Sequence, residues 1–246
     1  MSWRLRLIEE LKRLADHVED SEVKRILLEI LERPELTYSN TNPLVKLEDS
    51  PAAPRKHHFF TGGLLLHTFS VVKLAERISR VVEEIYGIRV NRDIVIAASI
   101  LHDIYKYYQY VKDNTYGGYK MREDWYLAHN YAVVGELIMR RAPEKLIRVV
   151  SEVHGDTPLT TIEGIVVHLA DSLDARLGEI LQNTMLSRTR DLETTCQLYK
   201  VLDKLILERG PGEIFSLIFE KPEEFRKIVS NACSSGSSES PVKREN

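Results

Sequence analysis

The sequence has only two cysteines, no long apolar run and no excess of basic charge. Cys196 and Cys233 lie far apart without CxxC spacing, which argues against a disulfide framework or a zinc ribbon and favours a reducing cytoplasm. No stretch approaches the roughly 18 to 20 apolar residues of a membrane span, and the first ten residues resemble an amphipathic helix rather than a signal peptide. The 34 basic and 37 acidic residues give no global basicity, so we expect no long duplex DNA as a partner. We therefore expect a cytoplasmic protein with no membrane partner.

Over most of the 246 residues, apolar side chains instead recur at helical spacing. This pattern predicts an all-α fold with helices over residues 3–18, 21–33, 62–86, 125–141, 143–153, 159–187, 190–208, 212–218 and 222–231, and with one helix after Asn91 that contains the apolar run 94–101. Thr61 and Asn91 are expected N-caps, and Gly87 is an expected helix end. Residues 231–246 are rich in Ser, Lys and Glu and lack an apolar pattern, so they are predicted to form a disordered tail.

A tyrosine-rich segment at 105–122 interrupts the helical pattern. Asp113-Asn114 and Gly117-Gly118 are turn signals, and they predict one short β-hairpin inserted in the helical bundle. The tyrosines are Tyr105, Tyr107, Tyr108, Tyr110, Tyr116 and Tyr119. In the interpretation that we favour, these rings are buried against the helices. In the alternative, they stack on bases while nearby lysines hold a phosphate backbone.

The candidate chemistry lies in the histidines and aspartates. His67 alone, within a leucine-rich helix face, is most simply a core histidine with satisfied nitrogens. His102-Asp103 is different, because it follows an apolar helix suited to burial, where an aspartate is costly unless it is paired or bound to a cation. Adjacent helical side chains diverge by about 100°, so this pair can approach one metal from two sides, or the carboxylate can bridge two metals.

Further residues extend this set. Asp171 also lies in an apolar run, and His129 and His154 add imidazoles from two other predicted helices. Imidazole and carboxylate ligands without thiolate suit Mn, Fe, Co, Ni or Zn, and Mg less well.

In their order, His67, His102-Asp103 and Asp171 resemble the HD superfamily of metal-dependent phosphohydrolases. His129 and His154 lie between them, as in the branch that binds two metals. Local motifs resemble the HD domain of bacterial 3'-to-5' exoribonucleases (YhaM-like), and the resemblance covers roughly residues 45–190. These motifs are Pro51-Ala52-Ala53, His57-His58-x-x-x-Gly62-Gly63-Leu64-Leu65-x-His67-Thr68, Asn91-Arg92-Asp93, Ile100-Leu101-His102-Asp103-Ile104-x-Lys106 and His168-x-x-Asp171-x-x-Asp174-Ala175.

The resemblance implies an HD domain at 46–208, with N-terminal helices at 1–45 packing on it and C-terminal helices at 209–230. The sequence departs from the exoribonuclease pattern in three places. Helical residues occupy the N-terminal part, where that family has an oligonucleotide-binding barrel. Tyr105 replaces the glycine of the family's HDxGK turn, and Val153 precedes His154-Gly155 where the family has a second histidine.

By this resemblance, the first metal takes His67, His102, Asp103 and Asp171. The second metal takes Asp103 as a bridge, with His129 and His154. We expect two divalent ions, with Mn, Fe, Co or Ni preferred to Zn or Mg. A hydroxide activated by these ions would attack the phosphorus atom.

Four more residues are candidates for contact with the substrate. Lys106, about one turn past Asp103, would direct its ammonium at the phosphate, or else is a solvated surface lysine. His58 would donate to the phosphate or protonate the leaving group, or else is a structural loop histidine. His57 would hydrogen-bond to a residue that itself contacts the metal or the substrate, and so orient that residue. Arg176 would pair with Asp174, on the surface or behind the ligands.

These residues predict a metal-dependent phosphohydrolase, and specifically a phosphodiesterase acting on nucleotides or short RNA. The missing barrel favours small substrates, and the two-metal set favours diesters. One alternative is a nucleotide phosphomonoesterase or triphosphohydrolase. Another is a nucleotide-sensing protein without catalysis. Leucine stripes in the N-terminal helices add a hypothesis of dimerisation, and so of a homo-oligomer.

Overall fold

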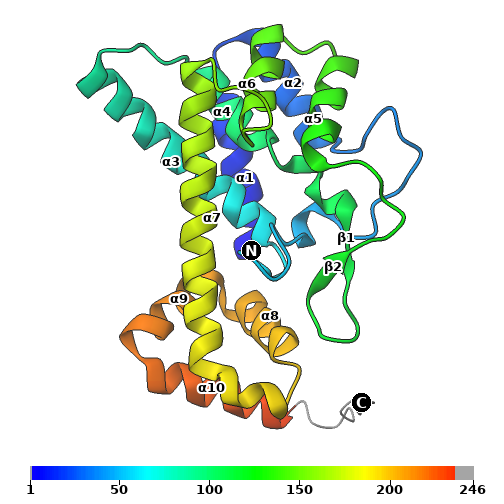
Figure 1. Cartoon of the computed structure of the whole chain (residues 1–246), viewed down its shortest axis with the longest axis vertical. Helices are drawn as coiled ribbons and strands as arrows, with labels where there is room; N and C mark the ends of the chain where they lie inside the picture. Colours follow the sequence, from blue (N-terminus) through cyan, green and yellow to red (C-terminus); the bar gives the residue numbers. More distant parts are fainter. Residues whose placement is uncertain (1, 236–246) are drawn as a thin grey trace.

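The computed structural model describes residues 2–235, and these are mostly helical (Figure 1). The elements are α1 (Trp3–Asp16), α2 (Ser21–Glu32), η1 (Leu47–Asp49), α3 (Gly63–Tyr86), α4 (Arg92–Leu101), η2 (Ile104–Gln109), β1 (Tyr110–Lys112), β2 (Tyr119–Met121), α5 (His129–Met139), α6 (Glu144–Glu152), α7 (Ile162–Thr189), η3 (Arg190–Thr194), α8 (Leu198–Arg209), α9 (Pro211–Glu220) and α10 (Pro222–Ser235). In the described range, β1 and β2 form a single antiparallel hairpin, with Tyr110 opposite Met121. The all-α class with one hairpin is confirmed, and residues 2–235 contain no oligonucleotide-binding barrel.

Helix α7 runs along most of the molecule and joins two hydrophobic cores (Figure 1). The first core gathers buried residues of α1 to α6 around the N-terminal half of α7, including Ile26, Val72 and Val167. The second core gathers α8, α9 and α10 around the C-terminal half, where Met185 is buried. Helix α8 packs with α9 and α10, although its residues were grouped with 46–208. The proposed boundaries at 45, 208 and 230 remain predictions.

The helix ends show where local signals decide the structure. Asn91 caps α4 as predicted, because its side chain accepts a hydrogen bond from the Ile94 amide at 3.1 Å. The prediction that Thr61 caps α3 was wrong. The helix begins after Gly62, whose φ of 85° suits a residue without a Cβ. The Thr61 hydroxyl instead contacts Asp203 at 2.9 Å and Tyr119 at 2.8 Å.

The C-terminal helices depart from prediction in two places. Residues 195–197 separate η3 from α8, and Cys196 in this break forms a disulfide with Cys233 of α10. The spacing of 37 residues concealed this pairing, which forms because α10 folds back onto α8. Residues 231–235 were assigned to a disordered tail but continue α10, because Cys233 is buried in the second core. The rest of the predicted tail, 236–246, lies outside the described residues.

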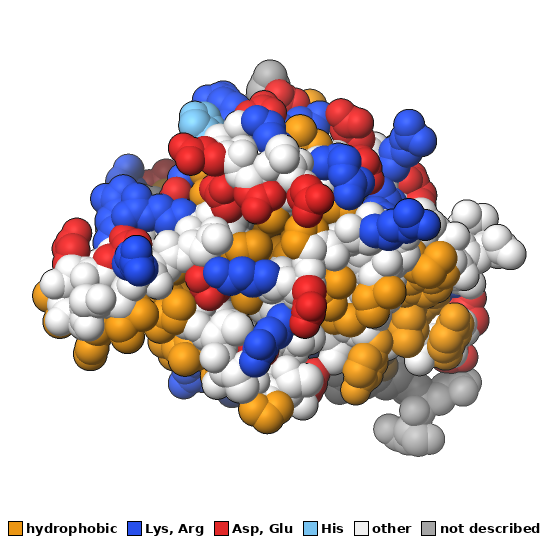
Figure 2. Space-filling model, turned by 90° about the horizontal axis from the view of Figure 1, so that it is seen from above, with side chains coloured by type: hydrophobic (Ala, Val, Ile, Leu, Met, Phe, Trp, Pro, Cys, Tyr) orange, Lys and Arg blue, Asp and Glu red, His pale blue; other side chains and the backbone are white. Residues whose placement is uncertain are grey.

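The distribution of charged side chains on the surface agrees with the near-neutral net charge of the sequence. On the face drawn in Figure 2, Lys and Arg side chains are interspersed with Asp and Glu side chains, and hydrophobic groups gather towards the edges. Among the described residues, no helix has the length and apolar character needed to span a membrane.

Candidate metal centre

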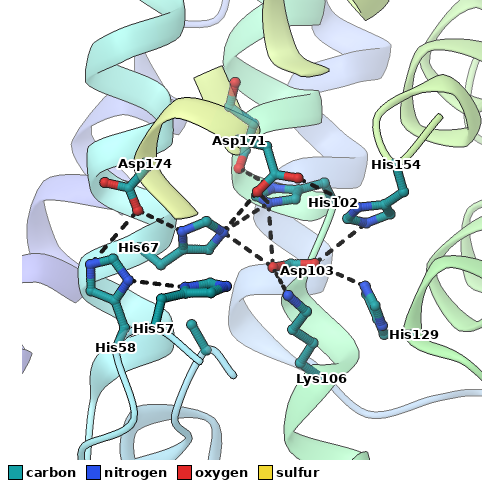
Figure 3. A network of polar contacts seen from close by, with 12 residues as sticks. His57, His58, His67, His102, Asp103, Lys106, His129, His154, Asp171 and Asp174 are labelled. Atoms are coloured by element: carbon teal, nitrogen blue, oxygen red, sulfur yellow. Dashed lines mark hydrogen bonds and ion pairs between the residues drawn. The ribbon is translucent and has the colours of Figure 1, made fainter. Parts of the chain in front are cut away.

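Six predicted ligands converge from five parts of the fold (Figure 3). His67 lies in the second turn of α3, and His102 and Asp103 stand at the junction of α4 and η2. His129 begins α5, His154 follows α6, and Asp171 lies in the N-terminal half of α7. Distant parts of the chain therefore meet because these helices share the first core.

The junction after α4 explains how two adjacent residues serve one centre. Seven of the ten residues of α4 are buried, so the helix carries His102 directly into the core. Asp103 has φ of −113° and ψ of 2°, outside the helical region, and η2 starts at the next residue. The imidazole and the carboxylate consequently leave the backbone in different directions.

In the first group of ligands, His67, His102 and Asp103 are fully buried and Asp171 is partly buried. His67 Nε2 lies 3.1 Å from Asp171 Oδ1 and 3.3 Å from Asp103 Oδ2. His102 Nε2 lies 3.5 Å from Asp103 Oδ2, 3.6 Å from Asp171 Oδ1 and 3.4 Å from His67 Nε2. These four residues offer ligand atoms that all lie within 4.8 Å of one another, a spacing that admits one metal ion.

In both His67 and His102, a hydrogen-bond partner of Nδ1 determines that Nε2 is the nitrogen available to a metal ion. His67 Nδ1 donates to Asp174 at 2.7 Å, and His102 Nδ1 donates to the Ser99 carbonyl at 2.9 Å. Each Nε2 therefore presents a lone pair to the carboxylates when its ring is neutral. Two lone pairs facing two carboxylates repel one another unless a cation lies between them.

The second group shares Asp103 with the first. Asp103 Oδ1 lies 3.1 Å from His129 Nε2 and 3.4 Å from His154 Nε2. On its other nitrogen, His154 Nδ1 lies 3.5 Å from Asp171 Oδ2. Asp103 thus faces one histidine pair with each of its oxygens.

Unsatisfied polar atoms show that this donor set fits metal ions. Both Asp103 oxygens, His129 Nε2 and His154 Nε2 are buried, and none of them meets the full geometry of a hydrogen bond within residues 2–235. Their close neighbours are one another, the first histidine pair and the Lys106 ammonium. Buried polar groups are normally bonded, and the exceptions point to a bound ion or to function. The donors are imidazole nitrogens and carboxylate oxygens, which suit transition metals.

The pKa shifts of His67 and Asp103 also show that positive charge is favoured in this cluster. Burial alone would lower the pKa of His67, but hydrogen bonds with Asp103 and Asp171 raise it well above its ordinary value. Burial would raise the pKa of Asp103, but Lys106 and His102 hold it well below its usual range. Buried carboxylates here hold nearby cationic groups in their charged form.

Lys106 belongs to the cluster. Its Nζ lies 2.5 Å from Asp103 Oδ2, and its side chain is only 12% exposed. It is therefore a buried partner of Asp103 rather than a solvated surface lysine.

His57 and His58 lie beside the first group, next to His67. His58 Nε2 lies 3.7 Å from Asp174 Oδ2, and the Nδ1 atoms of the two rings are 3.1 Å apart. Arg176 is not brought to the cluster. Its side chain is 66% exposed and pairs with Glu179 at 2.6 Å.

Asp174 makes more contacts with the histidines of the site than the sequence indicated. It is buried and contacts both His67 and His58 instead of pairing with Arg176. The spacing of three residues from Asp171 on α7 was the available signal, since i and i+3 share a helix face. His168, another residue outside the candidate set, donates to the Val153 carbonyl at 2.7 Å and so fixes the turn that carries His154.

The tyrosine-rich segment follows the favoured interpretation. Tyr105, Tyr107, Tyr108, Tyr110 and Tyr119 are buried. Tyr116, at the hairpin turn, is 67% exposed. The buried rings pack in the protein and are unavailable for stacking on bases.

Comparisons with known proteins agree with this geometry. A model of the HD domain family matches residues 64–176, which include all six predicted ligands. Over 205 residues the chain is 36% identical to a dihydroneopterin 2',3'-cyclic phosphate phosphodiesterase of Methanocaldococcus jannaschii, covering 80% of this chain and 81% of that protein. No solved structure matches the chain.

Similarity to exoribonucleases is more limited. The chain is 27% identical over 168 residues to the 3'-5' exoribonuclease YhaM of a Geobacillus species, covering 63% of this chain and 49% of that enzyme. It is 45% identical over 58 residues to the YhaM of Listeria welshimeri, covering 17% of that enzyme. The chain therefore spans half or less of these two exoribonucleases.

Proposed function

Since the chain belongs to the HD domain family and is a metal-dependent phosphohydrolase, we propose that it hydrolyses a phosphodiester bond in a nucleotide or short RNA. One observation carries the proposal: Asp103 directs its two oxygens at two separate histidine pairs. A carboxylate in that arrangement suits two cations close together, which is the arrangement that two-metal phosphoester hydrolases use.

The proposed ligands divide between the two ions. His67, His102, Asp103 and Asp171 would hold the first, and Asp103, His129 and His154 the second. When bound, two such ions supply Lewis acidity and lower the pKa of a water molecule towards about 7. Nitrogen and oxygen donors without thiolate favour Mn, Fe, Co or Ni over Zn or Mg.

Lys106 supplies charge to the substrate in this proposal. Its ammonium reaches Asp103 Oδ2, the same oxygen that faces His67 and His102. A cation held by that oxygen would repel the ammonium, which would then turn to the nearest anion, a substrate phosphate oxygen. Lys106 would thus bind and orient the phosphate group.

The choice of a diester draws on the relatives. The Methanocaldococcus protein, which matches four fifths of this chain, is named a cyclic phosphate phosphodiesterase, and YhaM is named an exoribonuclease. Both names describe cleavage of a phosphodiester. We propose only this shared chemistry for the present chain, and neither of the two named substrates.

The test combines metal analysis with a substrate panel. Purified protein should contain one to two equivalents of transition metal by elemental analysis. It should also cleave bis-p-nitrophenyl phosphate, cyclic nucleotides or short RNA faster than p-nitrophenyl phosphate. His17→Ala, at an exposed position after α1, is the matched control for histidine variants. Metal-loaded protein that cleaves monoesters but no diester would overturn the proposal.

A further inference from the structure

We propose that His57, rather than His58, meets the substrate, and that its Nε2 accepts a hydrogen bond from a hydroxyl on the carbon beside the phosphate-bearing carbon. His58 and Asp174 are positioning residues, which act on the substrate through His57. The inference rests on the proposed function, because it specifies which phosphodiesters that same site selects.

A continuous chain of contacts leads from α7 to His57 (Figure 3). Asp174 Oδ2 accepts from His67 Nδ1 at 2.7 Å and lies 3.7 Å from His58 Nε2. On the other side of its ring, His58 Nδ1 lies 3.1 Å from His57 Nδ1. His57 Nε2 is the last polar atom in this series.

The carboxylate at one end determines where the protons lie. Asp174 Oδ2 accepts the His67 Nδ1 proton at 2.7 Å and lies 3.7 Å from His58 Nε2, so it faces both rings as a carboxylate. Its charge favours a proton on His58 Nε2, because the other tautomer would place a lone pair against the carboxylate.

The remaining protons follow from this assignment. A neutral imidazole carries one proton, and His58 holds its proton on Nε2. His58 Nδ1 is then an acceptor, and the proton between the rings belongs to His57 Nδ1. His57 Nε2 is left with a bare lone pair.

Accessibility separates the two histidines. His58 is 5% exposed and has Gly178 and Asp174 of α7 against its ring, so a substrate cannot reach it. His57 is partly exposed. Its ring lies between His67 and Lys106, and Nε2 points away from His58 towards the metal cluster (Figure 3).

The backbone pays a conformational cost to hold this arrangement. His58 has φ of 47°, in the left-handed region that non-glycine residues rarely adopt. The Ala52 amide donates to the His58 carbonyl at 3.1 Å, and the Ala53 amide donates to the His57 carbonyl at 3.2 Å. Gly178 leaves space for the ring, since a Cβ there would lie 2.6 Å from His58 Nδ1. Such strain is typical of residues placed for function.

We assign the three neighbouring imidazoles to this series of contacts rather than to another metal site. His57, His58 and His67 offer nitrogens within 4.8 Å of one another. The Nδ1 atom of His67 and both nitrogens of His58 are already used in the contacts with Asp174 and His57. Only His57 Nε2 remains for a substrate.

A bare nitrogen in this place selects a particular substrate chemistry. A lone pair repels the oxygens of an anionic phosphate, so His57 does not grip the phosphate, which Lys106 is placed to bind. The same lone pair attracts an O–H donor next to the phosphate. A ribonucleotide diester presents that donor as its 2'-hydroxyl, and a deoxyribonucleotide lacks it.

The test compares a ribodinucleoside monophosphate with its deoxy counterpart. We expect the wild-type kcat/KM to favour the ribonucleotide about tenfold to a hundredfold. His57→Ala should bring this ratio close to one, and His57→Gln, whose amide oxygen can accept a hydrogen bond, should retain part of it. His17→Ala should keep the wild-type ratio.

A second variant tests the positioning role. Gly178→Ala places a methyl group against His58 and should reduce the preference severalfold. Gly212→Ala is the matched control, because a Cβ there meets no atom within 4 Å. If Gly178→Ala and the wild type show the same ratio of ribonucleotide to deoxyribonucleotide kcat/KM, the positioning role of His58 is wrong.

The proton assignment has its own readout. In protein loaded with diamagnetic Zn²⁺, the ¹⁵N shifts of His57 should show a protonated Nδ1 and a bare Nε2. A protonated Nε2, or a ribose preference that survives in His57→Ala, would overturn the inference. Cleavage of bis-p-nitrophenyl phosphate, which lacks the hydroxyl, reports separately on the proposed function. If no diester is cleaved, both proposals fall.

Discussion

The two sides of the candidate site rest on different parts of the protein. The proposed metal ligands come from helices, or residues that adjoin them, in the first core. His57 and His58 come from a loop whose next residues, Phe59 and Phe60, are buried in the second core. Asp174 and Gly178 of α7 support His58 from the other side, but the second core is a support that the proposed ligands do not share. A mutation in that support should therefore disturb substrate selection while sparing cation binding.

The loop is held by a few specific contacts. Asp203 of α8 accepts from the Thr61 amide at 2.6 Å, and the Tyr110 hydroxyl of β1 donates to the Ala52 carbonyl at 3.0 Å. The ligands on helices are fixed more firmly, because helical hydrogen bonds and core packing hold the backbone beneath them. The comparison predicts that changes near the loop alter rates more than metal content.

The largest effect is expected for Asp103→Ala. This substitution removes the carboxylate that both proposed groups of metal ligands share. Metal content should fall to near zero, and cleavage of bis-p-nitrophenyl phosphate should fall by about a thousandfold or more. Asp103→Asn, which preserves the volume, distinguishes lost ligation from lost folding. Asp16→Ala, at an exposed position in α1, is the control. Retention of both metals in Asp103→Asn would contradict the bridging role.

His129→Ala should have a smaller effect, because it removes a ligand from one group only. We expect loss of about one metal equivalent and a fall in kcat of roughly a hundredfold. Elemental analysis and kinetics measure both quantities, with His17→Ala alongside. Loss of all metal would show that the two groups do not bind independently.

Asp203→Ala addresses the loop side. It removes both hydrogen bonds to Thr61 and leaves a buried amide without its acceptor, at a cost of about 1 to 3 kcal/mol in stability. Metal content should remain at the wild-type value while kcat/KM on a ribonucleotide diester falls about tenfold. A parallel fall in metal content would show that the two sides are not separable.

The smallest effect is expected for Arg176→Ala. Its exposed pair with Glu179 contributes about 0 to 1 kcal/mol, and the side chain stands outside the cluster. Activity should change by less than about threefold on any substrate. A rise in KM of tenfold or more would restore the earlier expectation that Arg176 binds substrate.

Sequence predicted the features that depend on local pattern. Most helices followed from periodicity, and the Asn91 cap followed from the capping preference of asparagine. The candidate ligands, which remain a proposal, were found from histidines and aspartates that interrupt apolar helices and from the family resemblance. Thr61 was misassigned because its partner Asp203 lies 142 residues away. The roles of His57 and His58 depend on a carboxylate and a glycine of α7, so spacing within the loop could not separate them.

Helix α7 has a mechanical consequence. Its 28 residues extend over about 42 Å without a break, and they carry Asp171, Asp174 and Gly178 on the way to Met185 in the second core. A stiff rod of this kind transmits displacement along its axis. Asp171, Asp174 and Gly178 therefore keep fixed positions relative to one another, and a displacement of α7 would carry the Asp171 carboxylate and the groups that seat His58 together. His129 and His154 are attached to other parts of the first core and would not follow it directly.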